Sequence, residues 1–305
     1  MEKLLTLLTI PGPTGDEQAV ADWMANELRE IPGVALQRLG DNLLAVRGSP
    51  RTAIFAHLDT TGFTLGYRRQ LIPIGAPDPQ DKDELISAEG LRGRLRATAG
   101  DHRHAQLRRV RDAEGAKAKP VPGARGVYAR KPKIKGGVIT APYLDNRAGC
   151  WAALETLRRC ENAAAAFTTG EERHGHGARV CADWLYRQRG IAQAIISDLT
   201  WHTADTPCGK GPAISLRDAF SPRQAFLDRV LKHAEASGVV HQREIQSAGS
   251  SDGAHILRSS VPMDWVFIGA PEKYPHTSHE RATMSDLQRM IDLLTEVVAR
   301  LHQDD

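Results

Sequence analysis

Cysteine is scarce in this chain, with four residues among 305. They are scattered and form no C-x-x-C pair, which argues against a disulfide framework and against a zinc site built from thiolates. Long apolar runs are also missing, and the N-terminal segment has no small-residue cleavage pattern of a signal peptide. The sequence therefore predicts a cytoplasmic protein with no membrane partner.

Aromatic residues are rare in the one segment that is strongly basic. Residues 66–138 contain 17 Lys/Arg against 8 Asp/Glu, whereas the remainder contains 23 against 29. Such a segment is compatible with nucleic acid, an acidic substrate, a subunit interface or a solvated face. Its candidates for base stacking are Tyr67 and Tyr128 alone. We therefore expect no nucleic-acid partner.

Segments with the periodicity of amphipathic helices alternate with short apolar runs, which predicts an α/β sheet with helices on both faces. The predicted helices are 15–31, 146–160, 177–189, 222–237 and 284–302, and the predicted strands are 42–48, 52–57, 137–143, 163–169, 192–197, 213–217 and 263–271. Residues 66–138 break this rhythm and predict a small β-rich insertion. The predicted domains are thus 1–65 with 139–305, and 66–138.

Five of the apolar runs lead into a carboxylate or an imidazole. These side chains are His57 with Asp59, Asp145, Glu171 with Glu172, Asp198, and His276 with His279. Ligands of open α/β sheets bind at the carboxyl ends of the strands. Taken singly, such residues usually cap helices or make structural hydrogen bonds, and we assign Asp286 to the start of a helix. Several acids converging on one edge would repel each other unless a cation lies among them.

Histidine and carboxylate ligands with few cysteines favour zinc, with cobalt or manganese as substitutes. The neighbouring Glu171 and Glu172 leave their strand in different directions. One can therefore bind metal while the other accepts a proton from water.

The ordered stretches "AHLDTTGF", "APYLDNRAG", "TTGEE", "SDLT", "GKGPAI", "SSDGAHI" and "PHTSHE" resemble the motifs of the M42 family of metallo-aminopeptidases. They cover nearly the whole chain outside residues 66–138. The resemblance implies a mixed sheet sandwiched by helices, of the zinc-peptidase type, with a small β-barrel-like insertion domain. It also implies a homo-oligomer, which in this family is often a dodecamer.

The same resemblance implies an aminopeptidase with two zinc ions per subunit, acting on peptides through metal-activated water. The implied ligands are His57, Asp145, Glu172, Asp198 and His276, with Asp145 bridging both ions. Glu171 would be the general base, and Asp59 would orient His57. His276 is preferred to His279 because Glu280 follows it by four residues, as in the family pattern.

The chain departs from the family pattern at three positions. Asn146 stands where a second Asp is common, and His174 and His176 lie in the loop after Glu172. We interpret the two histidines as polar loop residues. Substrate preference and assembly are the properties that these departures affect most.

Three alternatives remain open from the sequence. A deacylase or a carboxypeptidase would use the same metals on a different substrate. "GSSDG" matches G-x-S-x-G and would make Ser251 the nucleophile of a serine hydrolase with Asp264 and His276; the family resemblance instead makes Asp252 a wall of the substrate pocket. "CGKGP" resembles a phosphate loop only weakly.

Overall fold

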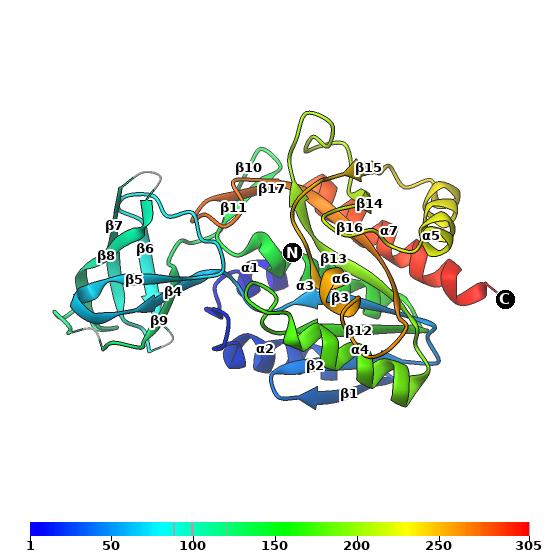
Figure 1. The fold of residues 1–305 in the computed structure, drawn as a ribbon, viewed down its shortest axis with the longest axis horizontal. Helices are drawn as coiled ribbons and strands as arrows, with labels where there is room; N and C mark the ends of the chain where they lie inside the picture. Colours follow the sequence, from blue (N-terminus) through cyan, green and yellow to red (C-terminus); the bar gives the residue numbers. More distant parts are fainter. Residues whose placement is uncertain (88, 99–100, 120, 305) are drawn as a thin grey trace.

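A large mixed sheet forms the body of the protein, and a second, smaller sheet projects from it (Figure 1). The computed structural model describes residues 1–87, 89–98, 101–119 and 121–304. Within these residues the large sheet has the order β1-β2-β12-β3-β13-β16-β17-β11-β10, with β14 and β15 branching from β16. The strands are β1 (Val34–Leu39), β2 (Asn42–Arg47), β3 (Thr52–His57), β10 (Lys133–Lys135), β11 (Val138–Ala141), β12 (Ala163–Thr168), β13 (Gln193–Trp201), β14 (Ala213–Arg217), β15 (Gln242–Ile245), β16 (Asp264–Lys273) and β17 (Glu280–Thr283).

Four neighbouring strands at the centre of this sheet, β12, β3, β13 and β16, run parallel, and the strands outside them pair mainly antiparallel. The whole of β12 is buried, as its unbroken apolar sequence predicts for a strand covered on both faces. The register sets His57 beside Thr168 and Asp198 beside Gly269. The carboxyl ends of the central strands therefore meet at one edge.

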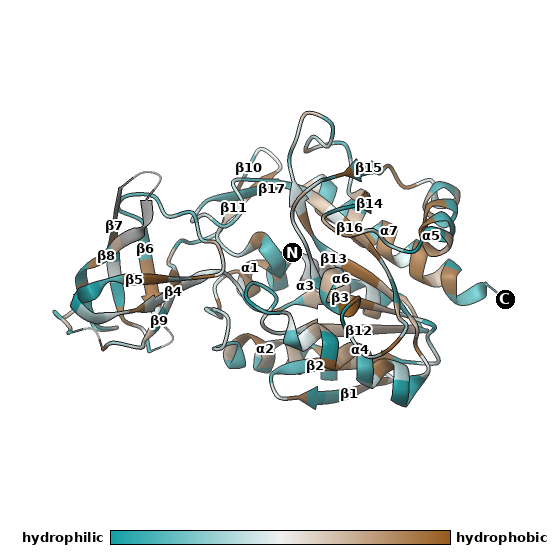
Figure 2. Cartoon of the chain, viewed as in Figure 1, coloured by the Kyte–Doolittle hydropathy of each residue, from teal (hydrophilic) through white to brown (hydrophobic). Residues whose placement is uncertain are grey.

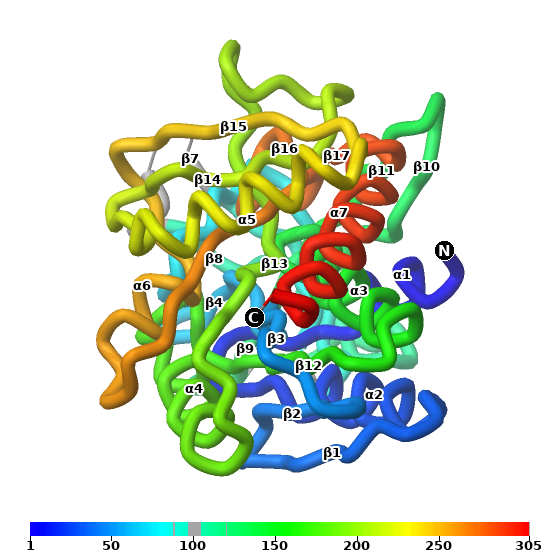
Figure 3. The backbone as a smooth tube through the Cα atoms, turned by 90° about the vertical axis from the view of Figure 1, so that its right-hand side faces the viewer, coloured from blue at the N-terminus to red at the C-terminus, as the bar shows by residue number. Residues whose placement is uncertain are grey.

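Helices cover both faces of the sheet (Figure 3). One face carries α1 (Glu2–Leu7), α2 (Gln18–Arg29), α3 (Leu144–Arg159), α5 (Gln224–Ser237) and α7 (Met284–Gln303), and the other carries α4 (His176–Arg189) and α6 (Asp252–Ile256). The hydrophobic residues gather in the sheet and on the helix faces that pack against it (Figure 2). This arrangement confirms the predicted α/β fold.

The smaller sheet curls back on itself. Its order is β5-β4-β9-β6-β7-β8, formed by β4 (Gly62–Leu65), β5 (Leu71–Ile74), β6 (Glu84–Ser87), β7 (Arg92–Thr98), β8 (Asp101–Arg111) and β9 (Arg125–Tyr128). A bridge between Gln70 and Gln106 joins the two edges, and Phe63, Leu85 and Val127 fill the interior. The predicted barrel-like insertion is thus present.

The two sheets divide the chain differently from the predicted boundaries at residues 66 and 138. β4 precedes residue 66 but belongs to the smaller sheet, whereas β10 lies within 66–138 and pairs with β11 of the large sheet. A run of alternating residues shows that a strand forms but not which sheet it joins. Within the described residues, no helix is long and apolar enough to cross a membrane.

Candidate metal centre

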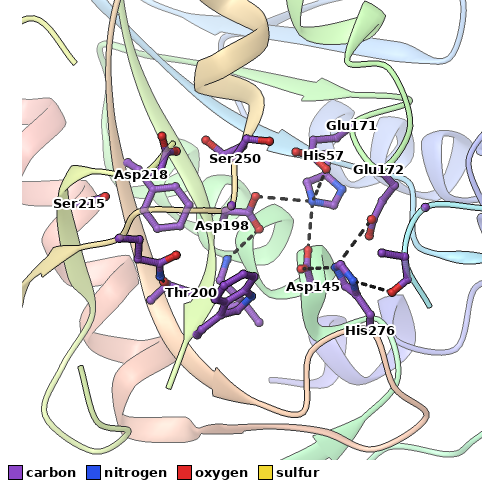
Figure 4. A pocket seen from close by; sticks show the side chains of 18 of the residues that line it. His57, Asp145, Glu171, Glu172, Asp198, Thr200, Ser215, Asp218, Ser250 and His276 are labelled. Carbon is purple, nitrogen blue, oxygen red and sulfur yellow. Dashed lines mark hydrogen bonds and ion pairs between the residues drawn. The ribbon is translucent and has the colours of Figure 1, made fainter. Parts of the chain in front are cut away.

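The carboxyl edge of the central strands borders a cavity of about 350 Å³ (Figure 4). His57 ends β3, Glu171 and Glu172 follow β12, and His276 follows β16. Asp198 lies inside β13, because this strand continues to Trp201 rather than ending at residue 197 as predicted. Its side chain still reaches the cavity, because strand residues on one face all point toward the same side.

Two clusters of potential metal ligands share one carboxylate. His57, Asp145 and Asp198 form the first, and Asp145, Glu172 and His276 form the second. The Nε2 atom of His57 lies 3.1 Å from Asp145 Oδ1 and 3.6 Å from Asp198 Oδ2. The Nε2 atom of His276 lies 3.5 Å from Asp145 Oδ2 and 3.7 Å from Glu172 Oε2. Each oxygen of Asp145 thus faces a different cluster.

The donor set fits divalent cations. Asp145 Oδ1 and Glu172 Oε1 are buried, and neither makes a hydrogen bond with the described residues. Buried carboxylate oxygens without a donor are costly, and a cation between them removes that cost. Imidazole and carboxylate ligands without thiolates are those of zinc, cobalt or manganese sites.

Asp59 explains how two adjacent glutamates are held at this edge. Its buried carboxylate accepts hydrogen bonds from the backbone N–H of Glu171 (3.1 Å) and of Glu172 (3.2 Å), and from Thr14 Oγ1 (2.7 Å). Its Oδ1 atom also lies 3.6 Å from Nδ1 of His57, whose Nδ1 is 3.1 Å from the Asp59 carbonyl oxygen. Asp59 therefore fixes the loop and the imidazole together.

Burial and repulsion between neighbouring carboxylates strongly shift the pKa values of the acids in the site. Burial raises the pKa of Glu172 to about 7 and raises the pKa of Glu171 well above its usual range, with further repulsion between the two. Burial alone would lower the pKa of His276, but Asp145 and Glu172 raise it to about 10. Burial opposes the charge of Asp145 as well, but both histidines outweigh it and lower the pKa of this acid. The site is thus arranged to balance negative charge with positive charge.

Comparison with known proteins places the chain among peptidases. The sequence profile of the family described as M42 glutamyl aminopeptidase matches residues 109–293. The chain belongs to the M42 family. It is a peptide hydrolase of this aminopeptidase family. A curated protein of Acetivibrio thermocellus, provisionally named an aminopeptidase, is 26% identical, with 95% of each chain covered.

Solved structures of other peptidases share the fold. An aminopeptidase from Desulfurococcus kamchatkensis is 20% identical with a TM-score of 0.85, covering 98% of this chain and 94% of the other. The TET1 peptidase of Pyrococcus horikoshii, described as assembling into a tetrahedron or a large octahedral shell, is 21% identical with a TM-score of 0.82, covering 97% and 98%.

The residues that depart from the M42 pattern lie outside both ligand clusters. Asn146 is buried, donates to the Ser197 carbonyl oxygen (2.9 Å) and accepts from the Gly149 N–H (3.0 Å). It therefore fixes the start of α3 to β13. His174 and His176 are exposed in the loop before α4 and in its first turn. His279 stacks near Tyr274 instead of joining His276.

The serine-hydrolase arrangement is not formed. Ser251 caps α6, and its Oγ accepts the Gly253 N–H (3.2 Å). Asp264 begins β16 and pairs with Arg223, whereas His276 follows the far end of that ten-residue strand. About 30 Å of extended chain separates them. Asp252, which the family resemblance makes a wall of the substrate pocket, is buried and accepts a hydrogen bond from Thr168 Oγ1 (2.5 Å), and its neighbour Ser251 lines the cavity.

Three further sequence interpretations are also decided by hydrogen bonds and burial. The N–H groups of Gly209 and Gly211 donate to the Asp286 carboxylate, so the weak phosphate-loop stretch binds its own chain. Thr283 caps the start of α7. Asp286 lies in the first turn of this helix, but its carboxylate also holds the loop that contains Gly209 and Gly211. Tyr128 is buried against Phe63, which removes it as a base-stacking residue.

The sequence analysis missed three polar residues of the same cavity. Ser215, Asp218 and Glu244 line it on the side away from His276, and all three are buried. Asp218 carried a signal, because it directly follows the predicted strand 213–217. Glu244 carried a weaker signal: it lies in the strand-like stretch "REIQSA", but the sequence does not show which strand this stretch pairs with.

Proposed function

We propose that the chain is a metal-dependent aminopeptidase with two divalent ions per subunit. The observation that supports it most strongly is Asp145, whose two oxygens face two separate histidine–carboxylate clusters. His57 and Asp198 would hold one ion with Asp145, and Glu172 and His276 would hold the other. Zinc suits these ligands, and cobalt or manganese could replace it.

The bound ions would supply Lewis acidity toward the peptide carbonyl and toward a water molecule. Glu171 faces the same cavity but belongs to neither cluster, and its Oε2 lies 3.9 Å from His57 Nε2. Burial raises its pKa, and a higher pKa makes a carboxylate a better proton acceptor. We therefore assign Glu171 as the general base and Asp59 as a positioning residue.

The experiment uses peptides in free and N-acetylated forms, assayed with the metal-loaded protein and after chelation. We expect only the free forms to be cleaved, with activity lost on chelation and restored by Zn²⁺ or Co²⁺. Glu171→Gln should lower kcat by about 10²-fold or more while metal content is retained. Activity that survives chelation would overturn the proposal.

The substrate alternatives are separated by the same panel. Cleavage of the acetylated peptides would favour a deacylase. Release of the C-terminal residue would favour a carboxypeptidase. The family match supports the aminopeptidase over both.

We also propose that the chain forms a homo-oligomer in the cytoplasm, and the assembly of the Pyrococcus horikoshii TET1 peptidase into a tetrahedron or a large octahedral shell supports the oligomer. The closed smaller sheet spans residues 62–128, and we propose these as the insertion domain. Arg92, Arg94, Arg109 and Arg111 line a hollow on it, beside Glu84. A dodecamer of 33.4 kDa chains would have a mass of about 400 kDa by light scattering, and a monomer would exclude it.

A further inference from the structure

The cavity beside the candidate metal centre contains a second group of buried acids. Asp218 follows β14 and Glu244 lies in β15, and their exposed fractions are 8% and 4%. Figure 4 shows Asp218, Ser215 and Thr200 on the far side of Asp198 from His276 and Glu172. These acids are therefore separate from both ligand clusters but open onto the same cavity.

Each acid uses one carboxylate oxygen within the protein. Glu244 Oε1 accepts from Thr200 Oγ1 (2.5 Å) and from Gln246 Nε2 (2.7 Å), and Asp218 Oδ1 accepts from the Phe220 N–H (2.6 Å). Within the described residues, these bonds leave Glu244 Oε2 and Asp218 Oδ2 without a donor. Both acids retain an oxygen that can accept a hydrogen bond from a ligand.

A third polar group, on the same side of the cavity as the two acids, also lacks a hydrogen-bond partner within the described residues. The Oγ atom of Ser215 is buried and makes no hydrogen bond with any described residue. Ser215 is 3% exposed and lines the same cavity. A buried hydroxyl is rarely left unpaired, so this one indicates a place for a polar ligand atom.

Within the described residues no cation forms an ion pair with either acid, and only the nearby charge of Arg217 partly offsets the burial of Asp218. Arg217 is exposed and donates to the backbone oxygen of Asp218 (3.1 Å), not to its carboxylate. Arg173 lines the cavity but is exposed beside Glu172. Burial raises the pKa of both acids, and Asp218 adds repulsion to Glu244. A ligand cation would relieve both effects.

The apolar side chains of Leu199, Trp201 and Phe267 line the same cavity as the two acids. Long basic side chains bury their methylene stems against such surfaces and place the charge at the polar end. The pocket thus matches a cation at the end of an aliphatic chain.

We propose that Asp218 and Glu244 receive the side chain of the substrate's N-terminal residue and select lysine or arginine. This inference rests on the proposed aminopeptidase function. It also separates this chain from the glutamyl preference in the family's description, because a glutamate side chain would face two carboxylates. Charge-assisted hydrogen bonds to the two acids supply the selection.

The decisive comparison is between N-terminal lysine and N-terminal norleucine, which has the same four-carbon stem without the ammonium group. We expect the metal-loaded enzyme to show a kcat/KM for lysyl p-nitroanilide about tenfold to hundredfold above that for norleucyl p-nitroanilide. The glutamyl substrate should be the poorest of the three.

Two substitutions remove charge and keep the internal hydrogen bonds. Asp218→Asn retains an oxygen for the Phe220 N–H, and Glu244→Gln retains an oxygen for Thr200 and Gln246. Each should reduce the lysine-to-norleucine ratio about tenfold. Asp228→Asn is the matched control, since Asp228 is exposed on α5 and bonds only Gln224 there. The control should leave the ratio unchanged.

Two results with the metal-loaded enzyme would overturn the inference: a lysine-to-norleucine ratio of kcat/KM equal to one, and a ratio that neither Asp218→Asn nor Glu244→Gln changes. A fall in both rates by the same factor would instead indicate that the acids bind the α-amino group. If no free-amine substrate is cleaved, the proposed function fails, and calorimetric binding of L-lysine against L-norleucine still decides the pocket: equal affinities overturn it.

Discussion

Asp59 provides the most direct test of how the site is held together, through the substitution Asp59→Asn. The residue is completely buried, and its pKa is lowered because His57 and its hydrogen-bond donors outweigh burial. Its Oδ2 accepts from both Thr14 and Glu172, and its Oδ1 accepts from Glu171. An asparagine must turn its NH₂ group toward one of these positions.

Either orientation leaves a backbone N–H facing another donor. With NH₂ at the Oδ2 position, the Glu172 N–H loses its acceptor; with NH₂ at the Oδ1 position, the Glu171 N–H loses it. A buried unpaired donor costs about 1–3 kcal/mol. The loop that carries Glu171 and Glu172 should therefore shift, and His57 loses the negative charge beside its Nδ1.

We expect Asp59→Asn to weaken metal binding about 10–100-fold and to lower kcat/KM by a similar factor or more. Calorimetric titration of the chelator-treated protein with Zn²⁺ measures the first effect, and peptide cleavage at saturating metal measures the second. The free energy of unfolding should fall by about 1–3 kcal/mol.

Thr14→Val is the matched control, because it removes one hydroxyl donor and keeps the Asp59 carboxylate. It should cost about 1 kcal/mol of stability and leave metal affinity nearly unchanged. If Asp59→Asn binds two ions as tightly as the unmodified protein and cleaves peptides at the same rate, Asp59 does not position this site.

Three further substitutions test other parts of the structure. Asp145→Asn should reduce the bound metal from two ions to one or none by elemental analysis, because both clusters use this carboxylate; retention of two ions would contradict the bridging role. Asp252→Asn should stabilise the chelator-treated protein above pH 6 but not below pH 4, measured by urea unfolding. Burial raises the pKa of Asp252 from 3.8 to about 6, so folding is penalised as pH rises through this interval, by up to about 3 kcal/mol. If the difference in the free energy of unfolding between Asp252→Asn and the unmodified protein does not change with pH, this reasoning is wrong. Asp286→Ala leaves the N–H groups of Gly209 and Gly211 unpaired and should lower the free energy of unfolding by about 2 kcal/mol in denaturant titration, with metal binding unchanged.

The parts of the fold that the sequence predicts are those encoded by local patterns. Buried parallel strands such as β12 are unbroken apolar runs, and amphipathic helices such as α7 repeat every 3.6 residues. The residues that gather at the cavity from β3, β12 and β16 follow because parallel strands end at a common edge. Asp198 reaches the same place from within β13, since its strand extends three residues beyond it.

Sheet membership was less predictable, because it depends on pairing between distant segments. β4 and β10 both show strand-like sequences, but each joins the sheet on the other side of the predicted boundary. The barrel closes through Gln70 and Gln106, which no local pattern connects. Hydrogen-bond partners of this kind are chosen by the packing of the whole chain.

The pocket that contains Asp218 and Glu244 also depends on strand pairing that local sequence patterns do not predict. Asp218 and Glu244 lie near each other because β14 and β15 pair in parallel. Helix α5 connects the two strands, so this pairing brings together residues that are far apart in the sequence. These two strands branch from β16, outside the strands that carry the histidine and carboxylate clusters. Changes in β14 and β15 can therefore alter the charge of the pocket without moving a candidate metal ligand. For this reason the ligand motifs predict the chemistry of the chain, whereas its choice of N-terminal residue depends on strands that those motifs do not include.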